Sequence, residues 1–287
     1  MNFDTPAWKE VDTLVAEQKL EAARAKLAEL RAAAERSGNA SDWTRALIRD
    51  VQLGTALGGV ESAVRTLREA TWPEDELSRL VLQLYYASTL LHYIDAYRYE
   101  IEERERVESK GPVDLELWTR EQIVGEALQS LQRVWLRRAA LSGSASILGP
   151  YVQLNNYPAG VRDTLRDVLS YHLVELLANT TYWRSADQND LFRVDHAALL
   201  AGGATAARGK ALDDVSVHPI VRATEVLVDL AGWHAAAGRA QAALEADLER
   251  FRRVHEAFSD EASRKAQTSA LEARLAKAVD VPWWSMG

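Results

Sequence analysis

The chain repeats a two-helix pattern, and this periodicity constrains its fold more than any other feature. Trp8 opens a first unit, WKEVDTLVAEQKLEAARAKLAEL, and Trp43 opens a second, DWTRALIRDVQLGTALGGVESAVRTL. A late stretch, LAGWHAAAGRAQAALEADLERF, reads in the same way. Each unit pairs a helix that carries bulky residues with a helix rich in Ala and Leu. Because one pair cannot bury its apolar face alone, the pattern predicts a stack of helix pairs.

The first two units can be aligned residue by residue. Their apolar positions share one constant offset of forty residues: Leu20, Ala23 and Leu27 in one unit, and Val60, Ala63 and Leu67 in the next. Helix-pair repeats have periods of roughly 34 to 47 residues. We therefore expect an all-α, tetratricopeptide-like array (an α-solenoid) of about ten or eleven helices. It would span 1–287 as a single helical-repeat domain, with 1–141 and 150–287 as possible sub-units and irregular loops at about 142–159 and 201–219.

Composition supports helices and restricts the chemistry that the chain can perform. Ala, Leu, Arg and Glu are frequent and are all strong helix formers, and no segment alternates as a strand would. The chain has no cysteine, which excludes thiol nucleophiles, disulfides and thiolate metal sites. The formal net charge of −8 disfavours a nucleic-acid partner, because phosphate binding needs a basic patch. No apolar run approaches the ~20 residues that span a bilayer, so we expect no membrane insertion.

The first residues leave two interpretations of the compartment open. The segment MNFDTPAWKEVD is acidic and has no hydrophobic signal core. Either the protein is cytoplasmic, or the chain is a segment of a longer periplasmic or secreted protein.

A long helix, predicted over about 74–108, carries the candidate interaction residues. Its predicted core stripe consists of Leu80, Leu84, Ala87, Leu91 and Ile94. One flank of that stripe carries Tyr85, His92 and Tyr99, and the other Tyr86, Tyr93 and Tyr97. Tyrosine is favoured at recognition surfaces, so Tyr85, His92 and Tyr99 are the candidate protein-binding residues. The alternative is that this flank packs in the core, with His92 as a hydrogen-bonded core histidine.

No group of residues has the arrangement that catalysis or metal binding requires. Asp167, Ser170 and His172 are the residue types of a triad, but they lie on one predicted helix and cannot align. His172 and Glu175 have the spacing of a helical metal site but lack the matching carboxylates of facing helices. The segment 203–210 has neither the glycine spacing nor the hydroxyl of a phosphate loop. We therefore predict that the protein is not an enzyme and uses no cofactor or metal.

Several segments resemble the N-terminal helical region of large bacterial alpha-2-macroglobulin-like proteins. They are WKEVD at 8–12 through ALI at 46–48, WTRALIR at 43–49, RERVES at 104–109, YP and GVRDTLRD within 157–167, and PWW at 282–284. The resemblance covers nearly the whole chain. In that family a similar opening segment precedes the macroglobulin β-sandwich domains. The resemblance implies an accessory helical domain in a protein of the peptidase-inhibitor type.

The leading hypothesis is a non-catalytic binding or scaffold domain of such a protein. It would contact a protein or peptide, or the following domains of the same chain. The family's protease-trapping residues have no counterpart here, since the sequence contains no cysteine for a thioester. The alternative is a stand-alone tetratricopeptide-like cytosolic scaffold that binds a peptide or regulates a partner enzyme.

Overall fold

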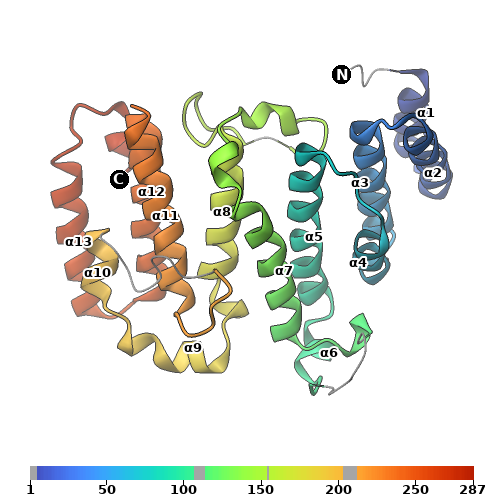
Figure 1. Cartoon of the computed structure of the whole chain (residues 1–287). Helices are drawn as coiled ribbons and strands as arrows, with labels where there is room; N and C mark the ends of the chain where they lie inside the picture. Colours follow the sequence, from blue (N-terminus) through green and yellow to red (C-terminus); the bar gives the residue numbers. More distant parts are fainter. Residues whose placement is uncertain (1–4, 107–113, 154, 203–211) are drawn as a thin grey trace. The chain divides into compact units, whose positions relative to one another are not determined.

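A computed structural model describes residues 5–106, 114–153, 155–202 and 212–287 (Figure 1). These residues form thirteen α-helices, six short 3-10 helices and no β-strand, so the predicted all-α class is confirmed. The number of helices exceeds the expected ten or eleven because α6 (Arg98–Glu102), α9 (Ser185–Asp190) and α10 (His196–Ala201) are short separate pieces. No helix within the described ranges has the length and apolarity needed to cross a membrane.

The chain divides into two compact units. The first contains residues 1–131 and 147–154, and the second contains residues 132–146 and 155–287. Helix α7 (Arg120–Trp135) begins in the first unit and ends in the second. Whether the whole chain is one repeat domain, or an α-solenoid, stays a prediction.

In the first unit, helices that follow one another in sequence pack against one another. The helices are α1 (Pro6–Ala16), α2 (Leu20–Ser37), α3 (Ala40–Ala56), α4 (Val60–Glu69) and α5 (Glu76–Ala96). Each of them contacts the next, and α3 also contacts α5. Since α2 begins at Leu20 and α4 at Val60, the offset of forty residues is confirmed in the backbone. The aligned positions Ala23, Leu27, Ala63 and Leu67 are all buried.

The turns between these helices need a residue in the left-handed region. Gly38, between α2 and α3, has φ +66°, and Gly58, between α3 and α4, has φ +86°. Glycine adopts this conformation readily because it has no Cβ. Gln18, between α1 and α2, has φ +59° and precedes Gly58 by the same forty residues. The repeat therefore extends to the turn, but the first unit has a less suitable residue there.

The single helix predicted over 74–108 is wrong. Helix α5 ends at Ala96, and Tyr97 leaves the helical region with φ −118° and ψ 29° before α6 begins. Arg104 donates hydrogen bonds to the carbonyl oxygens of Leu115 and Trp118, so tertiary contacts hold the chain after the break. Residues 107 and 108 lie outside the described part of the chain.

The predicted core stripe of this segment is largely confirmed. Leu80, Leu84, Ala87 and Ile94 are buried, whereas Leu91 is half-buried. The helical period is therefore correct for α5, and it fails only where α5 stops.

The second unit is organised around α12. Its longer helices are α8 (Leu165–Ala178), α11 (Pro219–Ala236), α12 (Ala240–Ala257) and α13 (Glu261–Leu275), followed by the 3-10 helix η6 (Pro282–Met286). Helix α11 packs against α8 and α12, and α12 also contacts α10, α13 and η6 (Figure 1). Three charged residues of α12, namely Glu245, Glu249 and Arg250, are buried by these neighbours. A charged helix at the centre of the unit needs partners for each of these groups.

The two predicted irregular loops have different outcomes. Within 142–159 the described residues form only one short 3-10 helix, Ala145–Leu148, as expected for an irregular segment. Nine of the nineteen residues of the loop predicted at 201–219, namely 203–211, lie outside the described residues, and residues 212–218 form no helix before α11 begins.

Candidate functional site

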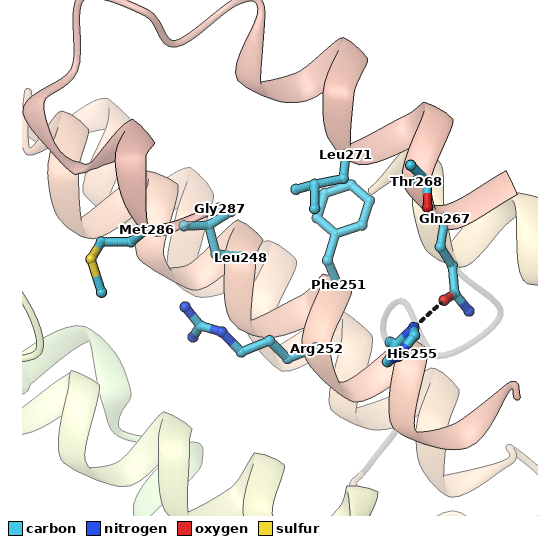
Figure 2. Close-up of a pocket in the computed structure, with 9 residues that line it drawn as sticks. All are labelled: Leu248, Phe251, Arg252, His255, Gln267, Thr268, Leu271, Met286 and Gly287. Carbon is cyan, nitrogen blue, oxygen red and sulfur yellow. Dashed lines mark hydrogen bonds between the residues drawn. The ribbon is translucent and has the colours of Figure 1, made fainter. Parts of the chain in front are cut away.

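A pocket of about 280 Å³ lies between α12, α13 and the C-terminal segment of the second unit (Figure 2). Nine residues line it: Leu248, Phe251, Arg252 and His255 from α12, Gln267, Thr268 and Leu271 from α13, and Met286 and Gly287. The α12 residues recur at helical spacing, so they share one face of that helix. None of the nine lining residues is acidic.

The floor of the pocket is apolar. It is formed by Leu248 and Phe251 of α12 and by Leu271 of α13 (Figure 2). Leu248 also belongs to a small buried cluster with Leu244 and Ala278, against which Leu271 packs. The walls are therefore supported from behind, and the pocket suits a small apolar group.

One end of the pocket is polar, and its side chains are joined by hydrogen bonds. The side-chain oxygen Oε1 of Gln267 lies 2.7 Å from Nδ1 of His255, as the dashed line in Figure 2 shows. Nε2 of Gln267 lies 3.2 Å from the carbonyl oxygen of Phe258 and 3.2 Å from Nε2 of His196 on α10. Gln267 is buried, so this amide ties three helices together.

Arg252 forms the basic edge of the pocket and is held by two buried carboxylates. Its Nη1 donates to Glu245 at 3.0 Å and to Glu249 at 2.9 Å. Arg162 donates to both glutamates as well, and Arg253 donates to Glu249 at 2.8 Å. Three guanidinium groups thus surround the two buried carboxylates, and Arg253 also pairs with Glu256 at 3.0 Å, so the cluster is balanced in charge.

The electrostatics of this cluster follow from its charge balance. Burial acts against the charged form of Glu249, but the charges of Arg162 and Arg253 outweigh it and lower the pKa of Glu249. Burial likewise opposes the charge on Arg252, yet hydrogen bonds from its guanidinium to Glu245 and Glu249 raise the pKa of Arg252. The pKa of Arg162 is raised as well, so Arg162, Glu249 and Arg252 remain charged near neutral pH.

Aromatic rings complete the surroundings of Arg162. Its guanidinium carbon lies 3.6 Å from the ring centre of Tyr171 and 4.6 Å from that of Tyr157. The Trp283 indole packs near Tyr157 and donates a 2.7 Å hydrogen bond to Glu245. Arg162 is also one of the few non-glycine residues with positive φ, at +53°. The contacts hold this residue in a strained conformation.

The three candidate residues of the tyrosine flank do not form one surface feature. Tyr85 is half-buried, and its hydroxyl donates to the carbonyl oxygen of Tyr151 at 2.7 Å and accepts from Gln52 at 2.6 Å. Burial raises the pKa of Tyr85, although the bond from Gln52 partly opposes this. Tyr99 is 84% exposed and lies on α6, beyond the break at Tyr97. Their role in protein binding stays a prediction.

His92 is exposed, so its interpretation as a core histidine is wrong. It lies on α5 at a position between the buried Tyr93 and the half-buried Leu91. Neighbours in sequence on a helix point in directions about 100° apart, so burial of one says little about the next.

The three residues considered as a triad on α8 have separate surroundings. Asp167 accepts a hydrogen bond from Nε2 of His234 on α11 at 2.8 Å, and both side chains are almost fully buried. His172 is exposed and its Nδ1 contacts only the carbonyl oxygen of Val168. Ser170 Oγ is buried without a hydrogen-bond partner. Of these groups, only Asp167 joins α8 to α11 through a side-chain hydrogen bond.

Metal binding finds no support among the residues that the structure describes, where no group of three or more His, Asp or Glu side chains could hold an ion. The pocket itself offers one histidine on its lining and no acidic side chain. Its lining combines an apolar floor, a basic edge and a fixed amide.

The chain matches no protein-family model, no curated protein and no solved structure. The resemblance to the helical region of alpha-2-macroglobulin-like proteins therefore rests on the sequence segments alone and stays a prediction. What the site can do follows from its own geometry.

The pocket was not found from the sequence. Leu248, Phe251, Arg252 and His255 read as an ordinary amphipathic face with a charged border. The position of Gln267 at a three-helix junction depends on how α10, α12 and α13 pack, and no local pattern marks it. The one available signal for the pocket was the helical spacing of residues 248, 251, 252 and 255, of which the first two are apolar and the last two basic.

Proposed function

We propose that this chain is a non-catalytic protein-binding domain. Its pocket between α12 and α13 receives an apolar side chain of a partner segment, and an acidic residue of the same segment lies beside that side chain. The observation that carries the proposal is the lining of the pocket: an apolar floor, a basic edge from Arg252 and His255, and no acidic side chain. Recognition sites for peptides combine such an apolar anchor with a few placed polar groups.

The apolar floor supplies affinity. Burying a side chain of the size of Leu or Val contributes roughly 1.5–3 kcal/mol. The C-terminal segment adds exposed apolar surface, since Trp284 is 46% and Met286 is 55% exposed and Met286 itself lines the pocket. A partner that covers both the pocket and this segment would bury more apolar area than a single side chain provides.

The basic edge supplies the preference for an acidic neighbour. The guanidinium of Arg252 lines the pocket and its side chain is 40% exposed, so it attracts an anionic group at this edge and repels a cationic one. This local positive charge contrasts with the net charge of −8 of the whole chain. An acidic segment is therefore favoured at this edge, although much of the surface would repel it.

The sequence segments that resemble alpha-2-macroglobulin-like proteins support a place for this domain in a bacterial protein of that type. In that setting the partner segment would belong to a following domain or to a recruited protein. The helix pairs of the first unit would act as a support, because their contacts are made between successive helices.

Filling the pocket tests the proposal. Thr268 is exposed, lines the pocket, and donates its hydroxyl only to Arg264 O, four residues earlier. Thr268→Trp should therefore fill the pocket without disturbing the core. Thr13→Trp is the matched control, because Thr13 is exposed on α1 and makes the same bond to Lys9 O.

Phage-displayed random peptides selected on the wild-type chain should be enriched in an apolar residue beside Asp or Glu. Their affinity should fall at least about tenfold for Thr268→Trp, which corresponds to about 1.4 kcal/mol, and should be unchanged for Thr13→Trp. Peptides that bind Thr268→Trp as well as wild type, or a selection without this composition, would refute the proposal.

A further inference from the structure

The polar end of the pocket depends on the protonation of two histidines. Gln267 of α13 lies between His255 of α12 and His196 of α10, at 2.7 Å and 3.2 Å respectively. Gln267 is 5% exposed, so water cannot easily replace a lost partner. The imidazole of His196 also packs against the ring of Phe258, with ring centres 4.8 Å apart.

The donors and acceptors among His255, Gln267 and His196 can be assigned from the backbone carbonyl of Phe258, whose role is fixed. The carbonyl oxygen of Phe258 can only accept, so the amide nitrogen of Gln267 faces it and Oε1 faces His255. His255 must then carry a proton on Nδ1. His196 Nε2 must accept from the same amide nitrogen, so His196 is neutral and carries its proton on Nδ1.

A proton on His196 breaks this arrangement in either orientation of the amide. Without a rotation of Gln267, the new Nε2–H of His196 meets an N–H group of the amide. After a rotation, Oε1 satisfies His196 but faces the carbonyl oxygen of Phe258, which then loses its donor. The amide nitrogen faces His255, whose Nδ1 can accept from it only if the proton moves to Nε2. One buried amide cannot satisfy all three neighbours once His196 is charged.

We infer that the His255–Gln267–His196 relay is a proton-sensitive latch, which holds α13 against α10 and α12 near neutral pH and releases it on acidification. The inference rests on the proposed function, because His255 and Gln267 line the same pocket. Release of the N-terminal half of α13 widens the pocket and weakens the binding of an apolar anchor. The latch thus makes ligand binding dependent on pH.

Charged groups lie around the latch on α10, α12 and α13. Asp195 and Asp260 act on His196 from the ends of α10 and α13. Arg252 lines the pocket, Arg250 donates to the carbonyl oxygens of Leu199 and Leu200, and Asp247 binds Arg250 and Arg274. Carboxylates and guanidinium groups ordinarily titrate far from the range of pH 5 to 8, in which histidine does.

The direction of the effect follows from the surroundings of His196. Burial lowers the pKa of His196 below its ordinary value of 6.5, and the charges of Asp260 and Asp195 oppose this only in part. The unfolded chain therefore takes up this proton at a higher pH than the folded chain. The contribution to stability is complete above about pH 6.5 and declines as the pH falls toward the folded pKa.

Hydrogen exchange on the full chain without ligand tests the latch directly. At about pH 5.5, the backbone amides of α13 should lose protection at least about fivefold relative to about pH 7.5, after correction for intrinsic exchange, while α11 serves as the internal reference. His196→Gln should remove this dependence, because its amide oxygen accepts from Gln267 at every pH. His172→Gln, an exposed histidine of α8, should behave like the wild type.

Two further measurements complete the test. Imidazole ¹⁵N chemical shifts should show His196 neutral with its proton on Nδ1 at about pH 7.5, and the other tautomer would overturn the inference even if His196→Gln did not fold. Equal protection of α13 at both pH values would also overturn it. The selected peptides should bind the wild type less tightly at about pH 5.5. If exchange depends on pH but no peptide binds, the proposed function fails and the latch stands.

Discussion

Replacing Arg162 by Met removes the central cation of the buried cluster in the second unit while keeping a long apolar side chain. Arg162 forms ion pairs with Glu245 and Glu249, and its guanidinium also lies over the aromatic rings of Tyr157 and Tyr171. The side chains of these glutamates are 1% and 6% exposed, so water cannot compensate them. We therefore expect Arg162→Met to destabilise the second unit strongly.

The size of the effect can be worked from the contacts. Arg162 makes hydrogen bonds to two charged acceptors, and bonds to charged groups contribute about 1.5–3 kcal/mol each. Arg252 and Arg253 remain, so neither carboxylate loses every partner. Removing one member of a buried ion pair costs about 3–5 kcal/mol. The two bonds together give about 3–6 kcal/mol and the second route about 3–5 kcal/mol, so we expect a loss of about 3–5 kcal/mol.

Urea denaturation at about pH 7, followed by circular dichroism, measures this loss as a change in the free energy of unfolding. Arg193→Met is the control, because Arg193 pairs with Asp190 in the same unit but is 70% exposed, and its loss should cost less than about 0.5 kcal/mol. Adding Glu245→Gln to Arg162→Met should restore part of the stability, because a buried neutral amide costs less than a buried carboxylate that has lost one of its partners. A loss below about 1 kcal/mol for Arg162→Met would refute the reasoning.

Two other predictions concern the first turn and the acid range. Gln18→Gly should raise the free energy of unfolding by about 0.5–1 kcal/mol, measured by thermal denaturation. The substitution relieves roughly 1–2 kcal/mol of left-handed backbone strain, which exceeds the free-energy cost of the conformational entropy that glycine adds to the unfolded chain. A lower melting temperature would contradict this. Burial opposes the charge of Asp167, but bonds from His234 and Thr164 lower the pKa of Asp167 below its ordinary 3.8. The contribution of Asp167 to stability is complete above about pH 4 and is lost as the pH falls through its folded pKa. Urea denaturation should therefore show a free energy of unfolding that declines between about pH 5 and pH 2, and the decline should be smaller in Asp167→Asn. A free energy of unfolding that stays constant over this range would contradict the prediction.

Much of the fold was predictable because helices depend on local periodicity. The offset of forty residues placed the starts of α2 and α4 correctly, and the stripe from Leu80 to Ile94 identified the buried face of α5. The two adjacent tryptophans near the end of the chain show the limit of such reasoning. Trp283 packs and bonds to Glu245, whereas its neighbour Trp284 remains 46% exposed. Their sequence context is almost the same, and only the packing separates them.

The candidate site was not predictable to the same degree. Tyr85, His92 and Tyr99 were grouped on the assumption that one helix continues past Tyr97, and the break there places Tyr99 on another helix. Asp167 was considered beside His172 on its own helix, but its partner is His234, 67 residues later. Contacts between distant segments carry no local signature, so these pairings could not be read from spacing.

The sequence by itself determined that the chain is helical, where most helices lie and which faces they bury, because those properties follow from side chains three and four residues apart. The tertiary structure decided which charges became buried, where α12 and α13 leave a pocket, and which histidines share the amide of Gln267. These features arise from the juxtaposition of α10, α12, α13 and the C-terminal segment. Hydrogen bonds and ion pairs act over a few ångströms in space, whatever the separation along the chain.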